Sequence, residues 1–146
     1  MASQASQSVM ISAQPAEILV VIGDFAAYPE WVEALSSCTV LTHHPDGSAD
    51  QVRFVIETGI VQDDYVLAYT WPATRLGVSW TLVRSQVMSA QTGSYALAPK
   101  GRDTEVTYAL SVELSIPMMA MFQRQAEKMI MDVALRSLKS RVEGGA

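Results

Sequence analysis

The longest uninterrupted helical pattern in the sequence runs from Pro117 to Val142 and reads PMMAMFQRQAEKMIMDVALRSLKSRV. Pro117 suits the first turn of a helix, where its missing N–H has no intrahelical partner. Ser115 is placed to cap that turn, and Gly144 and Gly145 end the pattern. Apolar residues recur near the helical period at Phe122, Ala126, Met129, Ile130, Val133, Leu138 and Val142. The pattern predicts one amphipathic helix of about seven turns, whose apolar stripe the rest of the chain must cover.

The segment before this helix alternates apolar and polar residues with a period of two, from Ser36 to Leu114. Such alternation is typical of strands with one dry and one wet face. The connections are short and rich in Pro, Gly, Asp and Ser, which indicates turns and an antiparallel meander. We predict strands at Cys38–His43, Asp50–Thr58, Val61–Trp71, Gly77–Arg84, Ser89–Ala98 and Thr104–Leu114.

The N-terminal part predicts a polar, flexible tail over residues 1–7, a strand over Ser8–Ser12 and a helix from Pro15 onward. Pro29 is expected to end this helix, because the residue before a proline is disfavoured in the helical conformation. A second short helical turn follows at Glu30–Val32. The order of elements predicts a single α+β domain over residues 8–143. In it, a curved antiparallel sheet of six to seven strands wraps round the long C-terminal helix, with two short helices after the first strand.

Composition and charge exclude several classes of function. Hydrophobic residues make up 49% of the 146, too many for a disordered chain. A formal net charge of -5 argues against a nucleic-acid partner and against an electrostatic membrane anchor. No apolar run approaches the ~20 residues of a membrane span. The N-terminus lacks the pattern of a signal peptide, so we expect a soluble, cytoplasmic protein.

The sequence offers no motif for a metal or a cofactor. Cys38 is the single cysteine, which excludes an internal disulfide and a cysteine-based metal cluster. His43 and His44 are adjacent in a strand, so their side chains point to opposite faces and do not share a metal easily. Glycine-rich nucleotide loops, HExxH and nucleophile-elbow patterns are all missing from the sequence. We therefore predict no metal and no cofactor.

Three passages resemble a known family. They are Ile11–Ile18 running into Asp24–Trp31 with its D-x-x-x-Y-P-x-W pattern, then Gly93–Pro99 with Thr104–Tyr108, and the terminal helix. Together they are similar to the START-like helix-grip superfamily (SRPBCC), in particular its polyketide cyclase/dehydrase and lipid-transport branch. The resemblance implies a helix-grip fold with a cavity between sheet and helix for an apolar or aromatic small molecule. It implies carriers as well as a few enzymes that cyclise or dehydrate their ligand.

Strand parity and the helical stripe select the side chains that would face such a cavity. The predicted ligand-binding residues are Phe54, Leu67, Tyr69, Trp71, Trp80, Leu82, Arg84, Tyr95, Tyr108, Phe122, Met129 and Val133. Tyr and Trp suit a pocket wall because each has an apolar body and one hydrogen-bonding tip. The alternative is that these side chains fill an ordinary core. Asp63 and Arg84 have the same parity as the inward-facing residues of their strands, so both are candidates to face the cavity. The alternative is that both lie at strand ends and are exposed to solvent.

Three functions stay open on the sequence alone. The first is a carrier or sensor that binds a small apolar or aromatic ligand, such as a lipid or polyketide. The second is a cyclase or dehydratase in which Tyr69, Tyr95, Tyr108 and Arg84 give general acid/base help. The third is a regulatory partner without a cavity. The methionines of the terminal helix fill the core, form an adaptable lining of the cavity or form a face that binds a partner. The sequence also leaves open whether the protein forms a homodimer.

Overall fold

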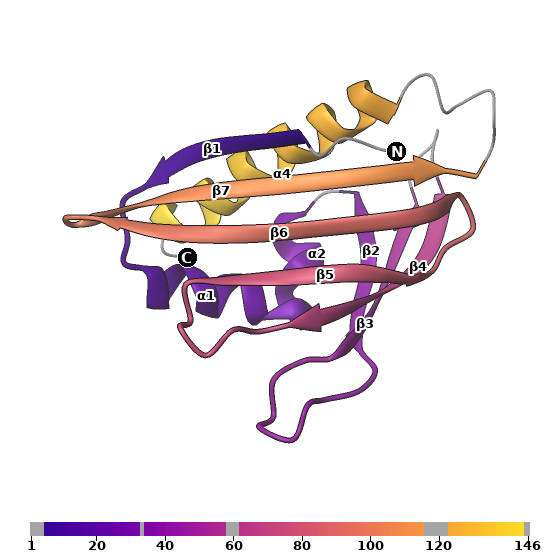
Figure 1. The fold of residues 1–146 in the computed structure, drawn as a ribbon, viewed down its shortest axis with the longest axis horizontal. Helices are drawn as coiled ribbons and strands as arrows, with labels where there is room; N and C mark the ends of the chain where they lie inside the picture. Colours follow the sequence, from indigo (N-terminus) through magenta and orange to yellow (C-terminus); the bar gives the residue numbers. More distant parts are fainter. Residues whose placement is uncertain (1–4, 33, 58–61, 116–122, 145–146) are drawn as a thin grey trace.

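The computed structural model describes residues 5–32, 34–57, 62–115 and 123–144. Seven strands and a long C-terminal helix make up most of this α+β, helix-grip structure (Figure 1). The strands are β1 (Ala5–Ile11), β2 (Leu35–Val40), β3 (Gln51–Glu57), β4 (Gln62–Thr70), β5 (Gly77–Arg84), β6 (Met88–Lys100) and β7 (Asp103–Leu114). The helical elements are α1 (Pro15–Gly23), a 3-10 turn η1 (Phe25–Ala27), α2 (Tyr28–Trp31) and α4 (Gln123–Gly144).

The strands form one antiparallel sheet in the order β1-β7-β6-β5-β4-β3-β2. From β2 to β7 each strand pairs with its neighbour in sequence, which confirms the predicted meander. β1 closes the other edge against β7, with Ala5 opposite Leu110 and Ile11 opposite Thr104. The sheet curves so that β1, β7 and β6 lie across β2, β3 and β4, and the helical elements lie in its hollow (Figure 1).

The concave face of the sheet is covered partly by α4 and partly by the short elements η1 and α2. α4 packs on β1 and β7, whereas η1 and α2 pack on β2. Polar contacts fasten α4 to the first strand: the Lys139 ammonium donates to the Met10 carbonyl at 2.6 Å, and the Ser12 N–H donates to Glu143 at 2.9 Å. The expectation that the C-terminal helix alone covers the sheet is therefore too simple, because Phe25 of η1 is as deeply buried as the helix core.

Several predicted boundaries differ from those observed. β1 begins at Ala5, so Ala5–Gln7 belong to the sheet and not to a flexible tail. β2 begins at Leu35, three residues before the prediction, and His43 forms only an isolated bridge with Ala49. The first helix ends at Gly23, and Pro29 lies in the first turn of α2 instead of ending a helix. Proline is tolerated there because a first-turn N–H has no partner to lose.

The C-terminal helix is confirmed over Gln123–Gly144. Its predicted start at Pro117 and the candidate residue Phe122 lie outside the described residues. Within the described part of the chain, no helix combines the length and apolar character needed to cross a membrane.

Candidate functional site

A continuous layer of aromatic rings covers the concave face of the sheet. Phe25 of η1 lies 4.9 Å, between ring centroids, from Tyr69 of β4, and Tyr69 lies 5.6 Å from Trp80 of β5. Trp80 then contacts Tyr95 of β6 at 5.5 Å and Tyr108 of β7 at 5.6 Å. These separations fall in the range where aromatic pairs attract beyond simple burial. The sheet curvature thus brings residues from five elements into one aromatic layer.

All five tyrosines of the chain gather in this layer, and we call them the tyrosine cluster: Tyr28, Tyr65, Tyr69, Tyr95 and Tyr108. Burial raises the pKa of every one of these phenols well above its ordinary value. The other phenols of the cluster raise the pKa of Tyr28, Tyr69 and Tyr108 further. Each phenol therefore keeps its proton at neutral pH and can donate a hydrogen bond.

Only one hydroxyl of the tyrosine cluster has a described partner. Tyr28 donates to the backbone carbonyl of Ile22, at the end of α1. For the hydroxyls of Tyr65, Tyr69, Tyr95 and Tyr108, no hydrogen bond joins them to the described residues. Tyr65 and Tyr95 are half-buried, although they sit in the middle strands of the curved sheet. Four phenolic donors are thus left available on one inner surface.

Trp80 lies at the centre of the aromatic layer, and its place depends on two residues of β6. Gly93 is directly opposite Trp80, and a Cβ at Gly93 would lie 2.3 Å from the indole ring. The indole N–H donates to the Gln91 side-chain oxygen at 2.8 Å. The missing side chain at Gly93 therefore provides room for the ring, and Gln91 fixes its orientation.

Trp71 lies at the edge of this layer, just after β4. Its ring stacks on Tyr69 with centroids 6.0 Å apart, and its N–H donates to the Ala49 carbonyl at 2.7 Å. His44 lies next to the same strand end, where its Nε2–H donates to the Tyr69 carbonyl at 2.7 Å. Trp71 therefore connects the interior layer with the loops that follow β2 and β4.

The structure places eight of the twelve predicted ligand-binding residues on the inner face. Five are buried, namely Phe54, Leu67, Tyr69, Trp80 and Tyr108. Three are half-buried and pack against the core, namely Trp71, Leu82 and Tyr95. Whether any of them contacts a ligand stays a prediction.

Arg84 was predicted to face inward, and the structure contradicts this. Its side chain is 56% exposed and lies 3.8 Å from Asp64, which also holds Arg53 at 2.6 Å on the outer face. The reason is a β-bulge: Leu67 pairs with Leu82 but Val66 pairs with Arg84, so Val83 is an extra residue in β5. One extra residue reverses the side on which all later side chains lie.

Asp63 does face inward, but it has no arginine partner there. Its carboxylate is 4% exposed and accepts hydrogen bonds from Ser85 Oγ at 2.7 Å and the Gln86 N–H at 2.9 Å. The Asp64 N–H adds a third bond at 2.8 Å. These contacts fix the β5–β6 turn, so Asp63 has a structural role.

Met129 and Val133 were predicted to face the cavity, and this orientation is wrong. Met129 is 67% exposed and Val133 is 43% exposed. The inner face of α4 instead carries Met131, Leu135 and Leu138, each at most 2% exposed. The helix has apolar residues on more than one side, so periodicity alone did not identify which side packs on the sheet.

A charged residue of α4 is also buried, which the sequence analysis did not anticipate. Glu127 is 2% exposed, and its Oε2 accepts a hydrogen bond from the Val112 N–H of β7 at 2.7 Å. Its Oε1 has no hydrogen-bond partner and lies 3.7 Å from Arg124. Glu127 therefore links α4 to β7 through a backbone group.

Two residues of the aromatic layer were missed as site residues, Phe25 and Tyr28. They lie in the last part of the first predicted helix, which the structure forms as η1 and the start of α2, and Phe25 packs on Tyr28 with ring centroids 5.0 Å apart. Their spacing of three residues was a weak helical signal, but nothing in the sequence showed that η1 and α2 insert into the hollow of the sheet. Tyr65 was expected to face inward and does so, stacked on Phe54 at 5.1 Å.

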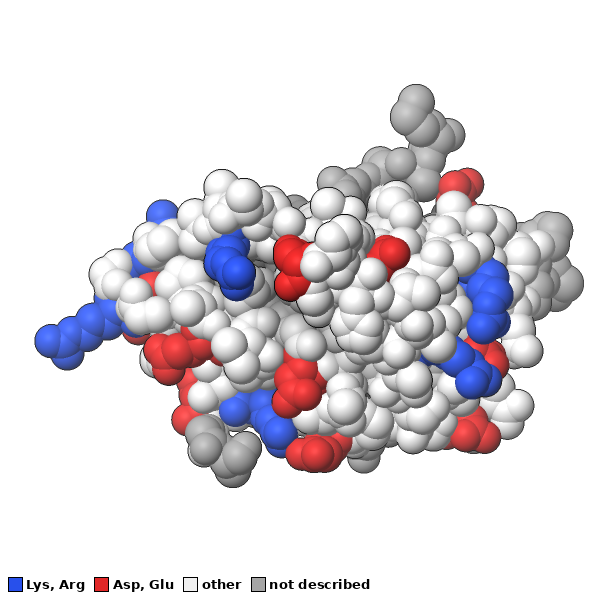
Figure 2. Space-filling model, turned by 90° about the horizontal axis from the view of Figure 1, so that it is seen from below, with Lys and Arg blue, Asp and Glu red and all other residues white. Residues whose placement is uncertain are grey.

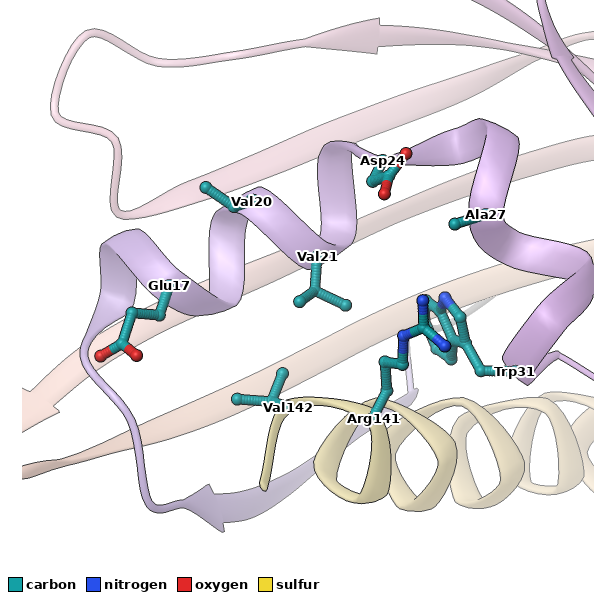
Figure 3. A pocket seen from close by; sticks show the side chains of 8 residues that line it. All are labelled: Glu17, Val20, Val21, Asp24, Ala27, Trp31, Arg141 and Val142. Atoms are coloured by element: carbon teal, nitrogen blue, oxygen red, sulfur yellow. The ribbon is translucent and has the colours of Figure 1, made fainter. Parts of the chain in front are cut away.

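Two surface grooves border α1, and their charges differ. The first, which we call the α4 groove, has a volume of about 280 Å³ and lies between α1, α2 and the end of α4. Val21 and Val142 point toward one another across it, and Arg141 extends beside Trp31 (Figure 3). Arg141 is held by Glu30 at 3.1 Å, so the cation in this groove is already paired.

The second groove, which we call the α1 groove, is larger and more apolar. It has a volume of about 620 Å³ and lies between α1 and the connections that follow β2 and β4. Its lining includes Leu19, Val20, Gly23, Trp71, Arg75 and Leu76.

One face of the molecule, seen in Figure 2, carries acidic side chains interspersed with basic ones.

No group of three or more His, Cys, Asp or Glu residues within the described ranges is arranged to hold a metal ion. Cys38 is buried, and this burial raises the pKa of its thiol to about 12. The thiol therefore stays protonated and unreactive at neutral pH.

Comparisons with known proteins agree with this architecture. The sequence profile of the family described as polyketide cyclase / dehydrase and lipid transport matches residues 3–143, nearly the whole chain. No curated protein matches the chain in sequence.

Solved structures share the fold at low sequence identity. A START superfamily protein from Mycobacterium smegmatis is 24% identical, with 98% of this chain and 99% of that chain covered and a TM-score of 0.88. The Zhui aromatase/cyclase from Streptomyces sp. R1128 is 10% identical, with 98% and 94% covered and a TM-score of 0.85. Norcoclaurine synthase from Thalictrum flavum, solved with dopamine and hydroxybenzaldehyde, is 7% identical, with 100% and 89% covered and a TM-score of 0.76. At these identities the likeness is one of fold.

Proposed function

The chain belongs to the polyketide cyclase/dehydrase and lipid transport family, and we propose that it binds a small apolar or aromatic molecule against the aromatic layer, between the sheet and the helices. The role is that of a carrier or sensor. Affinity comes from burial of the apolar surface of the ligand, at roughly 25 cal/mol per Å² before the cost of ordering. Rigid aromatic walls keep that cost low, because Tyr and Trp lose few rotamers on binding.

The observation that carries the proposal is the set of four phenolic donors without a partner among the described residues: Tyr65, Tyr69, Tyr95 and Tyr108. Burial raises their pKa, although Tyr65 and Tyr95 keep accessible surface. This combination is expected where rings border an enclosed space that solvent or a guest occupies. None of these four hydroxyls is sealed in the core, because Glu127 Oε1 is the one fully buried side-chain polar atom without a partner among the described residues, so the donors are open to solvent or to the acceptor atoms of a ligand.

The chemistry of the donors suggests the class of ligand. Neutral phenols donate to carbonyl or ether oxygens, and flat rings stack on aromatic ligands. A polycyclic or polyketide-like ketone satisfies both preferences, whereas a plain hydrocarbon satisfies only the second. Norcoclaurine synthase was solved with two aromatic compounds, which supports an aromatic guest on this fold.

The enzymatic alternative has less support from the side chains. The general acid/base set of Tyr69, Tyr95, Tyr108 and Arg84 is not assembled, because Arg84 lies on the outer face with Asp64. The raised pKa of each phenol keeps it protonated at neutral pH, so it serves as a hydrogen-bond donor and not as a base. We therefore favour binding over cyclase or dehydratase activity.

A pair of probes tests the proposal. 2-Acetylnaphthalene has one carbonyl, and 2-ethylnaphthalene has nearly the same shape without it. We expect quenching of tryptophan fluorescence by both compounds, with tighter binding of the ketone. Tyr95→Phe with Tyr108→Phe should reduce the preference for the ketone by about thirtyfold, at about 1 kcal/mol for each of the two lost hydrogen bonds. Trp80→Ala should weaken both probes.

Met129→Gln is the matched control, because Met129 is exposed on the outer side of α4. It should bind both probes as the wild type does. Equal binding of both probes by the wild type, or affinities unchanged by Trp80→Ala in a folded variant, would refute the proposed site. Independently of these probes, native mass spectrometry of protein purified from its own host would identify a small molecule that co-purifies with it.

A further inference from the structure

The α1 groove has the size of a ligand site, and large apolar side chains are exposed on its walls. Its volume of about 620 Å³ lies within the range of ~300–1,000 Å³ typical of small-molecule pockets. Val20 is 71% exposed and Leu76 is 42% exposed on its walls. Leu19 and Trp71 add partly buried surface between them. A hollow of this size with mostly apolar walls suits an apolar segment of a small molecule.

A single unpaired cation lies beside this apolar surface. Among the described residues that line the groove, Arg75 is the one with a formal charge, and none is Asp or Glu. Within the described residues, no carboxylate pairs with the Arg75 guanidinium, whereas Arg53, Arg84 and Arg141 all have acidic partners. The whole chain carries a net charge of -5. The groove is therefore a locally cationic, apolar site on an acidic protein, and its charge complements an anion.

The backbone at Arg75 gives an independent reason to look for a role. Its φ of 56° lies in the left-handed region, and it is the one non-glycine residue in the described ranges with a positive φ. The Arg75 N–H closes the turn by donating to the Pro72 carbonyl at 3.1 Å. Glycine adopts this conformation without the steric cost that a side chain brings. Residues in strained backbone conformations cluster at binding sites, where the interactions of the side chain outweigh the free-energy cost of the strain.

We propose that the α1 groove binds an anionic amphiphile with a single alkyl chain. The chain lies along Leu19, Val20 and Trp71, and the carboxylate lies at Arg75. The ring of His43, which also lines the groove, borders the same space. This site shares Trp71 with the edge of the aromatic layer, but its other walls lie outside the tyrosine cluster and it does not depend on a ligand there.

Decanoate and decanol test the alkyl-chain contact and the contact between carboxylate and Arg75 separately, because the two compounds share the alkyl chain and differ in charge. Both are titrated below their aggregation concentrations into the full chain, with isothermal calorimetry for affinity and amide NMR shifts for location. We expect shifts at Leu19, Val20 and Leu76. The quantity of interest is the ratio of the dissociation constants of decanoate and decanol for each variant.

Arg75→Gly is the central variant, because it suits the backbone conformation and removes the cation. We expect an unchanged or higher melting temperature and a loss of about fivefold in relative affinity for decanoate, the size of an exposed ion pair. Arg75→Lys should retain most of the preference. Arg136→Gln removes an equal charge from an exposed position on α4 and should leave the ratio unchanged. Val20→Asn should weaken both compounds alike.

Three results would overturn the assignment. One is an unchanged ratio in Arg75→Gly together with a stable fold. Another is a set of NMR shifts confined to Tyr95, Tyr108 and their neighbours, which would place the alkyl chain in the interior. The third is binding to phosphatidylglycerol vesicles without binding of monomeric decanoate, which would make the groove a membrane contact.

Discussion

At the scale of single residues, Gly93 is the position where the aromatic layer depends most on one side chain being absent. The Trp80 ring lies across β6 at this point, and the nearest ring atoms would be 2.3–2.4 Å from an added Cβ. Real Cβ atoms do not approach rings so closely, and Trp80 itself is held by Gln91 and by contacts with three tyrosines. These contacts oppose a shift of the ring away from β6.

We therefore expect Gly93→Ala to lower the free energy of unfolding by about 1–3 kcal/mol, the usual cost of overpacking a filled core. Chemical denaturation monitored by tryptophan fluorescence measures the change. Gly144→Ala is the control, because nothing lies within 4 Å of an added Cβ at the end of α4. A Gly93→Ala variant as stable as the control would show that the ring moves aside without cost.

At the scale of elements, the contact between α4 and β7 combines a hydrophobic face with one buried carboxylate. β1 pairs with β7 from Thr104 to Leu110 in the described residues, and Val112 lies beyond that pairing. Glu127 accepts the hydrogen bond from the Val112 N–H instead. An α-helical side chain thus completes the hydrogen bonding of a strand, which fixes the position of the helix along the sheet.

Glu127→Ala should lower the free energy of unfolding by about 2 kcal/mol or more, because it leaves the Val112 N–H buried without a partner. Glu127→Gln keeps an acceptor oxygen and should cost less. Urea denaturation gives the stability, and hydrogen exchange at the Val112 amide should accelerate only in the alanine variant. Glu113→Ala, an exposed neighbour on β7, is the control. Equal exchange rates in the two alanine variants would contradict the anchoring role.

At the scale of the whole molecule, the tyrosine cluster makes the fold sensitive to alkaline pH. Burial raises the pKa of all five phenols in the folded state. In the unfolded chain the phenols ionise near pH ~10. Stability is therefore fully present below that pH and is lost as pH rises above it, because the unfolded state releases protons that the folded state retains.

We expect near-ultraviolet absorbance to show little tyrosinate until the chain unfolds, and then all five phenols should ionise together. Circular dichroism should report unfolding over the same pH interval. Tyr95→Phe with Tyr108→Phe should shift this interval to higher pH if the variant folds normally at pH 7. The buried Cys38 thiol titrates late as well, so Cys38→Ala serves to separate its contribution. Gradual ionisation near pH ~10 with the fold intact would show that the phenols are accessible.

Much of the architecture followed from the sequence. Short connections between alternating segments predicted an antiparallel meander, because strands joined by a few residues must pair with each other. The bounds of Gly77–Arg84 agree with β5 residue for residue, and most other strand bounds agree within one to three. Parity also identified Phe54, Tyr69, Trp80 and Tyr108 as inward-facing. These properties are local, so each segment determines them by its own pattern.

Other features were decided only when the segments packed together. The bulge at Val83 reversed the side of Arg84, and α4 buried Met131 and Leu135 while it exposed Met129 and Val133. No periodicity distinguishes these outcomes, because each depends on how one element crosses another. The gathering of all five tyrosines has the same origin. Their positions in the chain are far apart, and the curvature of the sheet, which only the complete fold produces, brings their rings into one layer.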